Sequence, residues 1–282
     1  MATSNIGNRR IGVLAPFLGG YYYGAVLAGL LRSAAARAVQ VVAIQTKGTD
    51  LCWATWPKSA PLAIDAVDGF IAVNDFDSRE VLAAISEHRL PLVCIGFKPE
   101  GIDCCSVLAD NRAGAKSAAM HLIAHGHRRI GFVGYFEHLD IRERYAGYLD
   151  AHADAGIDVD PELLFPSTNN MELDGREVGR LLTRGGLPCT ALMTGTDKNA
   201  LGVLYAMQEA GHRVPEDLAI VGFDDIDASQ YAAPPLSTVR QRFDVLGETA
   251  AELLLDRLEK TNARPDVVRV PAVFVARASC GC

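Results

Sequence analysis

Short apolar runs alternate with longer segments of helical pattern along the whole chain. The apolar runs lack the one-in-two alternation of a half-exposed strand, so they are typical of parallel strands that are buried on both faces. Strands that alternate with helices of about 10 to 15 residues or more indicate βαβ units. The pattern therefore predicts a doubly wound α/β fold. The clearest runs lie at 11–15, 39–44, 68–73, 91–96, 129–134, 190–195 and 218–223.

A short repeat predicts that this fold has two lobes. Residues 9–14 read Arg-Arg-Ile-Gly-Val-Leu, and residues 128–133 read Arg-Arg-Ile-Gly-Phe-Val. The spacing between the copies is about 120 residues, which is the size of one small α/β lobe. We expect each copy to open a lobe with its own parallel sheet. The alternative is that a basic residue before a strand produces such a match by itself.

The stretch 47–63 is the least regular part of the chain. It holds both tryptophans, Trp53 and Trp56, together with Pro57 and Pro61, and it shows no clean period. Prolines and aromatic residues in this arrangement predict a loop or a very short helix. Such a loop either makes a contact of its own or covers the core.

Composition and charge narrow the class of protein. The 282 residues carry a net charge of −7, with 49% hydrophobic and 22% charged residues. This excludes a mainly disordered chain, and the acidic balance argues against a dedicated nucleic-acid surface. No apolar run approaches the roughly 18 to 20 residues that span a bilayer, and the first ten residues lack the apolar core of a secretory signal. We therefore expect a cytoplasmic protein with no membrane partner.

Motifs of enzymes and of metal sites are missing from the sequence. It has no phosphate-binding P-loop, no Gly-x-Ser-x-Gly turn and no His-Glu-x-x-His helix, and residues 15–21 lack the glycine spacing that a dinucleotide needs. His125 and His127 look like a cluster at a helix end, where cations complement the helix dipole. Cys280 and Cys282 are two thiols with no nearby histidine or cysteine pair, which makes a weak metal site. We predict no catalytic residue, no metal site and no cofactor.

Polar residues follow several of the predicted strands, at the edge where open α/β sheets bind ligands. Asp197 and Asp224 follow two strands, and the helix after a third strand brings Arg144. Carboxylates and a guanidinium group form charge-assisted hydrogen bonds with vicinal hydroxyls, and aromatic rings such as Tyr22 and Tyr23 cover the apolar face of a sugar. Each residue also has a plain structural interpretation: the aspartates as helix caps, the arginine as a solvated helix face and the tyrosines as core. Two carboxylates and an arginine also describe many hydrolases.

At this point the sequence resembles the effector-binding core of the LacI/GalR family of bacterial transcriptional regulators, which is similar to periplasmic sugar-binding proteins. The resemblance covers residues 9 to 279. Its strongest block begins at Thr196-Asp197 and runs through Val214-Pro215-Glu-Asp217 to Gly222-Phe-Asp224-Asp225. Further matching segments are 68–71, 110–134, 144–147, 235–241, 246–251 and 275–279.

The resemblance implies two lobes that face each other across a cleft and are joined by three crossings, near residues 108, 239 and 263. One lobe would hold 9–108 and 239–262, and the other 109–238 and 263–282. A ligand in the cleft would change the arrangement of the lobes, and two copies of the chain would form a homodimer.

By the same resemblance, Asp224 and Arg144 match polar residues of the family's cleft, and Tyr22 and Tyr23 stand where members have two phenylalanines. Three departures leave the ligand's identity open: Phe17 stands near a position where a polar residue is common, Gly20 replaces an asparagine, and Asn170 stands where some members have an aromatic residue. The predicted ligand-binding residues are Phe17, Tyr22, Tyr23, His138, Arg144, Thr196, Asp197 and Asp224.

These observations predict a non-enzymatic sensor domain for a small polar ligand, a carbohydrate by preference. Family repressors begin with a DNA-binding helix-turn-helix, whereas fewer than about a dozen residues precede the first strand here. We therefore expect no direct DNA contact by these residues, and a role either in a LacI-type regulator or in a fused signalling protein. A secreted sugar transport-binding protein and a hydrolase on a similar scaffold are the alternatives.

Overall fold

The structure, a computed structural model, describes residues 9–46, 64–74, 79–259 and 266–282. The predicted loop at 47–63, with Trp53 and Trp56, lies outside the described residues. The chain divides into two compact units. Unit 1 comprises Met1–Ala109 and Arg242–Val270, and unit 2 comprises Asp110–Gln241 and Pro271–Cys282.

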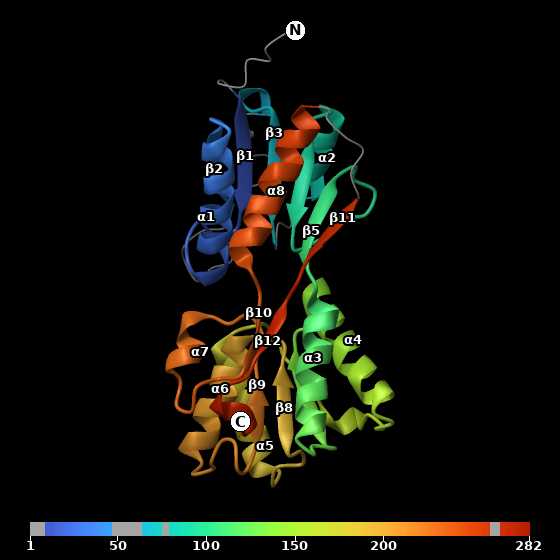
Figure 1. Cartoon of the computed structure of the whole chain (residues 1–282), viewed down its shortest axis with the longest axis vertical. Coiled ribbons are helices and arrows are strands. Elements are labelled where there is room, and N and C mark those ends of the chain that lie inside the picture. Colours follow the sequence, from blue (N-terminus) through green and yellow to red (C-terminus); the bar gives the residue numbers. More distant parts are fainter. Residues whose placement is uncertain (1–8, 47–63, 75–78, 260–265) are drawn as a thin grey trace. The chain divides into compact units, whose positions relative to one another are not determined.

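Unit 1 is built on a six-stranded parallel sheet with strand order β11-β5-β4-β3-β1-β2 (Figure 1). Toward one edge of this sheet, Ile11 of β1 is in register with Val41 of β2 and with Gly69 of β3. The strands are β1 (Arg10–Ala15), β2 (Gln40–Gln45), β3 (Gly69–Val73), β4 (Leu92–Ile95), β5 (Cys105–Ala109) and β11 (Val267–Val270). The helices are α1 (Tyr21–Ala36), η2 (Ile64–Ala66), α2 (Arg79–Glu87) and α8 (Phe243–Leu258).

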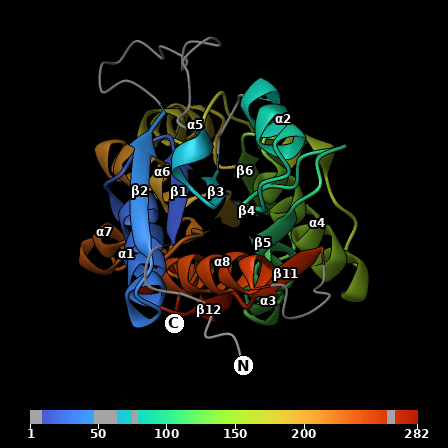
Figure 2. The ribbon, with the colours of Figure 1, turned by 90° about the horizontal axis from the view of Figure 1, so that it is seen from above.

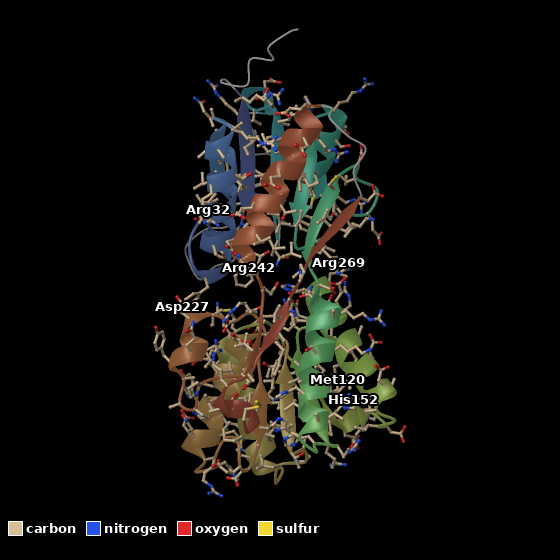
Figure 3. All side chains as sticks on the ribbon, viewed as in Figure 1. Arg32, Met120, His152, Asp227, Arg242 and Arg269 are labelled. Carbon is tan, nitrogen blue, oxygen red and sulfur yellow. The ribbon has the colours of Figure 1, made fainter. Side chains whose placement is uncertain are left out.

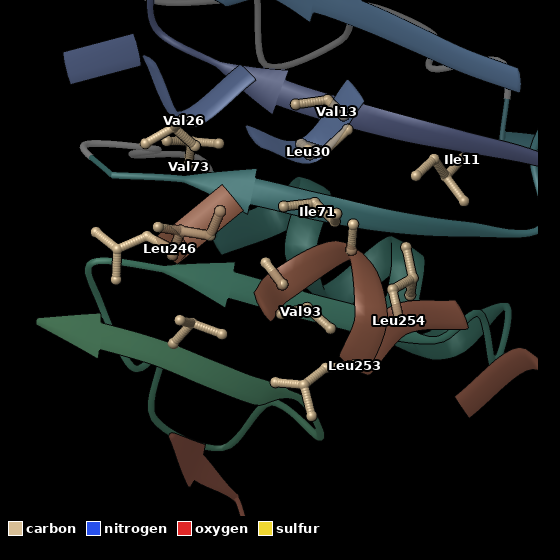
Figure 4. Close-up of a cluster of buried hydrophobic side chains, with 14 of the residues drawn as sticks. Ile11, Val13, Val26, Leu30, Ile71, Val73, Val93, Leu246, Leu253 and Leu254 are labelled. Atoms are coloured by element: carbon tan, nitrogen blue, oxygen red, sulfur yellow. The ribbon is translucent and has the colours of Figure 1, made fainter. Parts of the chain in front are cut away.

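The strands of unit 1 alternate their side chains between two cores, because successive residues of a strand point to opposite faces. On one face, Val13 and Ile71 pack with α1 and α8, as the close-up in Figure 4 shows. On the other face, Leu14 and Phe70 pack with α2. Figure 2 shows α8 and α2 on opposite sides of this sheet. Both faces are therefore apolar, which explains why the strand sequences do not alternate.

Helices α1 and α8 approach each other through two glycines. A Cβ atom added at Gly247 would lie 2.0 Å from the carbonyl oxygen of Val26, and one added at Gly29 would lie 1.9 Å from that of Asp244. On the outer side of this crossing, Arg32 of α1 forms an ion pair with Glu248 of α8 at 2.7 Å. The labels in Figure 3 mark Arg32 beside the beginning of α8. The backbones therefore pack directly against each other at this point.

One predicted crossing between the lobes is wrong. The prediction placed residues 263–282 in the second lobe, but β11 pairs in parallel with β5, with Val268 in register with Val107. The chain therefore leaves unit 1 for the last time after Val270, and the earlier divisions fall after Ala109 and Gln241.

Unit 2 contains a four-stranded parallel sheet with strand order β7-β6-β8-β9 and a separate antiparallel pair, β10 with β12. Its strands are β6 (Ile130–Gly134), β7 (Leu164–Pro166), β8 (Ala191–Thr194), β9 (Ala219–Val221), β10 (Thr238–Arg240) and β12 (Val273–Val275). Its helices are α3 (Asn111–Ala124), α4 (Leu139–Asp154), η3 (Pro161–Leu163), α5 (Glu172–Arg184), α6 (Asp197–Glu209), α7 (Asp227–Tyr231) and η4 (Ala278–Cys280).

The sheet of unit 2 is also covered on both faces. Phe132 and Met193 pack with α3 and α4 on one face, and Val133 and Leu192 pack with α5 and α6 on the other. The predicted α/β class with parallel sheets is thereby confirmed. Among the residues described, none of the helices is long and apolar enough to cross a membrane.

Candidate functional site

Three of the predicted site residues meet at the carboxyl edge of the sheet in unit 2. Strands β6, β8 and β9 are neighbours in this sheet, so the segments that follow them lie side by side. Arg144 comes from the second turn of α4, which follows β6, while Gly195 and Thr196 follow β8 and Asp224 follows β9. The topology therefore concentrates polar groups at the edge where α/β sheets bind ligands.

Asp224 is a partly exposed acid at this edge. Its Oδ1 accepts a hydrogen bond from Nε2 of Gln241 at 2.7 Å and one from Nη1 of Arg144 at 3.4 Å. Within the described residues, these bonds leave Oδ2 available to a further donor. The side chain is 18% exposed. Asp224 can therefore accept hydrogen bonds from a ligand with one oxygen while the other oxygen is held.

The turn that carries Asp224 has an uncommon backbone. The φ angle of Asp224 is 125° and that of Asp225 is 58°, and both are positive although neither residue is glycine. Such conformations cost on the order of 1–3 kcal/mol and collect at functional sites. The turn is held by the Asp224 N–H, which donates to the carbonyl of Val239 at 2.8 Å, and by the Asp225 carboxylate, which binds Arg240 and Arg277.

Arg144 lies behind Asp224, with a side chain only 4% exposed. Its Nε donates to Oδ1 of Asn111 at 3.0 Å, its Nη1 donates to the Gly195 carbonyl, and its Nη2 lies 2.9 Å from Oδ2 of Asp140. The ring of Phe223 lies 4.0 Å from the guanidinium carbon. The guanidinium group is therefore held by Asn111, Gly195, Asp140 and Phe223 and lies beside the Asp224 carboxylate.

Burial dominates the electrostatics of Asp224. Desolvation raises the pKa of its carboxyl group to about 7, and the negative charges of Asp197 and Asp140 act in the same direction. Arg144 and the hydrogen bond from Gln241 lower this pKa, but less strongly. An additional hydrogen-bond donor, such as a ligand hydroxyl, would stabilise the ionised form of this carboxyl group.

A second polar group lies at the same edge, after β7 and β8. Thr196 caps α6 by accepting from the N–H of Asn199, and its hydroxyl lies 3.3 Å from the carbonyl oxygen of Asn170. The amide nitrogen of Asn170 lies 3.2 Å from Nδ1 of His138, whose ring contacts Tyr135. The amide oxygen Oδ1 of Asn170 is buried and accepts no hydrogen bond from the described residues. Buried acceptors normally have a partner, so Asn170 joins the candidate site, although sequence reasoning had noted it only as a departure.

The predicted ligand contact of Asp197 is not supported by its surroundings. Asp197 is fully buried, with 0% of its surface exposed. Oδ2 accepts from the N–H of Ile226 and from the hydroxyl of Ser229, and Oδ1 accepts from the hydroxyl of Thr238. Burial raises the pKa of this carboxyl group. Asp197 therefore anchors α7 and β10, and it does not form an exposed carboxylate pair with Asp224 of the kind a hydrolase would use.

This anchoring role predicts the effect of Asp197→Ala. We expect the free energy of unfolding to fall by about 2–4 kcal/mol, because three buried donors lose their acceptor. Thermal unfolding and hydrogen exchange in α7 measure this loss. Ligand affinity of the folded protein changes far less than in an Asp224 variant. An unchanged stability together with lost affinity would instead restore the role of a ligand contact.

The aromatic residues predicted from the first lobe gather at the carboxyl edge of the sheet in unit 1. The ring of Tyr23 lies 5.7 Å from that of Phe17 and 4.9 Å from that of Tyr22, with T-shaped geometries. Tyr22 also packs on Phe243 at 5.0 Å. A Cβ atom added at Gly96, after β4, would lie 3.1 Å from the Tyr22 hydroxyl. Both tyrosines are half-buried against the core, so they combine a packing role with a position at the sheet edge.

Residues 119–280, more than half of the chain, match the family model of the periplasmic binding protein-like domain. The chain belongs to this family. A curated relative, the HTH-type transcriptional repressor PurR of Mannheimia succiniciproducens, is 33% identical over 223 residues, which cover 77% of this chain and 66% of the relative. The PurR repressor of Pasteurella multocida is also 33% identical, over 76% of this chain and 64% of its own length. The chain thus spans slightly less than two thirds of these relatives.

A solved structure of a LacI family regulator shows the same fold over nearly all of this chain. The LacI family transcriptional regulator from Enterococcus faecium, determined with bound ribose, is 26% identical with a TM-score of 0.81, and the alignment covers 96% of this chain and 98% of the regulator. These comparisons support a LacI-family effector-binding core. Its relatives are named as transcriptional regulators and not as enzymes.

Proposed function

We propose that the chain is the effector-sensing core of a LacI-type transcriptional regulator and that it binds a small polyhydroxylated ligand. The alternative is that the same core belongs to a fused signalling protein. In this proposal it has no catalytic role, works in the cytoplasm as a homodimer and changes the arrangement of its two units when the ligand binds. The observation that carries the proposal is the partly exposed carboxylate of Asp224, which lies beside the buried guanidinium group of Arg144.

Chemistry supports this ligand class. A carboxylate with one oxygen held and one available accepts hydroxyl hydrogens, and charge-assisted hydrogen bonds of this kind are about twice as strong as neutral ones. The buried acceptor of Asn170 adds a second point of contact at the same edge. The aromatic rings of Phe17 and Tyr23 offer apolar faces of the kind that cover a sugar ring. The regulator from Enterococcus faecium with bound ribose provides the first compound for testing.

The test is a thermal-shift screen of aldoses, polyols, disaccharides and nucleosides against the wild-type chain, followed by calorimetry of each hit. A ligand that binds only the folded state raises the melting temperature. We expect at least one carbohydrate to do so, and we expect small-angle scattering to change on its addition. If the protein is folded, whether as a dimer or as a monomer, and its melting temperature responds to none of these classes of compound, the proposal is contradicted.

The raised pKa of Asp224 predicts a pH dependence. Only the carboxylate form leaves Oδ2 free of a proton and able to accept a charge-assisted hydrogen bond from a ligand hydroxyl, so affinity rises as pH passes through about 7. We expect about tenfold weaker binding at about pH 6 than at about pH 8, in proportion to the ionised fraction. Calorimetry at constant ionic strength measures this, and Asp224→Asn, which has no group to titrate, gives a flat profile. Stronger binding at the lower pH would contradict the assigned role.

The stability of the ligand-free protein changes with pH in the direction opposite to ligand affinity. Because the pKa of Asp224 is raised above its ordinary value of 3.8, folding takes up a proton in this range. The stability that this group contributes is fully present at low pH and is lost as pH rises toward about 7.

A further inference from the structure

Four side chains with metal-binding chemistry gather at the C-terminal end of α3, away from the site described above. His121 and His125 lie one helical turn apart, so they share a face of the helix. Cys280 and Cys282 come from the turn that ends the described chain. In Figure 3 the label of Met120, the residue before His121, shows where this part of α3 lies. All four residues belong to unit 2.

The ligand atoms of His121, His125 and Cys282 all lie within 4.8 Å of one another, and Cys280 adds a sulfur close to His121 and Cys282. Nε2 of His121 lies 3.1 Å from Sγ of Cys282 and 3.4 Å from Sγ of Cys280. The two sulfur atoms are 3.2 Å apart, and Nε2 of His125 lies 3.7 Å from Sγ of Cys282. With Zn–S bonds of about 2.3 Å and Zn–N bonds of about 2.0–2.1 Å, neighbouring ligand atoms of a tetrahedral site are about 3.3–3.8 Å apart. A tetrahedral shell of all four ligands therefore needs Cys280 and His125 to approach each other, with small adjustments of His121 and Cys282.

The backbone on both sides of the cluster is fixed by the fold. Ser279 accepts from the N–H of Ser237 at 2.8 Å and donates to the carbonyl of Ile220 at 2.7 Å, which ties the terminal turn to the sheet. Gly281 has a φ of 90°, and this left-handed conformation turns the chain so that Cys282 faces α3. The ring of His121 packs on Phe274 at 4.5 Å. The backbone of the terminal turn and the ring of His121 are therefore held by the fold before any ion binds.

We propose that His121, His125, Cys280 and Cys282 bind one zinc ion in a tetrahedral site. Two imidazole nitrogens and two thiolate sulfurs are a donor set that selects zinc over magnesium or calcium. The two thiols release their protons to solvent on binding, and the neutral imidazoles supply nitrogen lone pairs. Four protein ligands complete the shell, so the ion has a structural role and joins α3 to the terminal turn. This site is independent of the proposed effector function.

The first test measures metal binding by the full chain, expressed without a histidine tag and kept under reductant. We expect about one zinc per chain by plasma mass spectrometry. Substitution by Co²⁺ gives the visible bands of tetrahedral cobalt and a thiolate-to-cobalt charge-transfer band. An octahedral cobalt spectrum, or no zinc retained against an indicator of about micromolar affinity, would overturn the proposal. A disulfide between Cys280 and Cys282 in the reduced preparation would overturn it as well.

The second test uses variants of exposed ligands, which keep the fold intact. His125→Ala and Cys282→Ser each remove one ligand from a surface position. We expect each substitution to weaken zinc binding by at least about 100-fold. This effect is larger than the effect of removing a group that only supports a metal ligand. His127→Ala is the matched control, because His127 lies two residues further on and binds the hydroxyl of Thr190. Equal zinc affinity in His125→Ala and His127→Ala would exclude the site.

Discussion

Asp224→Asn is expected to lower ligand affinity by about 10- to 100-fold while the ligand-free protein becomes as stable or more stable. The substitution removes a charge-assisted hydrogen bond, which contributes about 1.5–3 kcal/mol to binding. The amide oxygen still accepts from Gln241 and Arg144, and Arg144 keeps its ion pair with Asp140. Isothermal calorimetry at about pH 8 measures the affinity, and thermal unfolding without ligand measures the stability.

The gain in stability follows from the pKa of the carboxyl group. At pH 8 the wild-type protein holds a buried carboxylate whose pKa is raised to about 7, and the amide removes this unfavourable charge. We expect a gain on the order of 1–3 kcal/mol above about pH 7.5, and a smaller gain at lower pH. Asp150→Asn is the control, since Asp150 pairs with Arg112 on the outside of α4. It should leave affinity unchanged. If both variants bind equally well, Asp224 does not contact the ligand.

Gly247→Ala is expected to destabilise unit 1 by about 3 kcal/mol or more. The added methyl group would overlap the carbonyl oxygen of Val26, which belongs to the backbone of the opposite helix and moves only if α1 and α8 separate. Hydrogen exchange followed by mass spectrometry resolves the two units. Peptides of α1 and α8 should lose protection, while those of α5 and α6 keep it.

Gly24→Ala is the matched control in α1. A Cβ atom at Gly24 meets only the backbone of Gly19, at 3.6 Å, which is an ordinary contact distance. Because alanine is favoured over glycine in helices, this variant should be neutral or more stable by about 0.5–1 kcal/mol. The account of the helix crossing fails if Gly247→Ala is as stable as Gly24→Ala.

The sequence was sufficient for the fold class because buried parallel strands leave a local signal. The runs around Val13 and Val133 are apolar on both faces, and this needs no knowledge of distant contacts. The edge positions of Asp224 and Arg144 follow from the same reasoning, since each comes directly after a strand or early in the next helix. The pairing of β11 with β5 escaped prediction because the two strands lie far apart in sequence.

What the sequence did not reveal depends on contacts between distant segments. A helix cap and a ligand-binding carboxylate look alike at Asp197, and only the hydroxyls of Ser229 and Thr238, 32 and 41 residues further on, distinguish them. Cys282 has no histidine near it in the chain, while the fold supplies His121 from 161 residues away. The earlier prediction of no metal site is therefore replaced by the zinc proposal.

The most direct test of the account is a crystal structure of the chain with the tightest ligand from the screen. We expect hydroxyl oxygens of the ligand within hydrogen-bond distance of the Asp224 carboxylate, with Arg144 still bound to Asn111 and Asp140 behind it. A ligand bound elsewhere, with Asp224 and Asn170 untouched, would contradict the central claim.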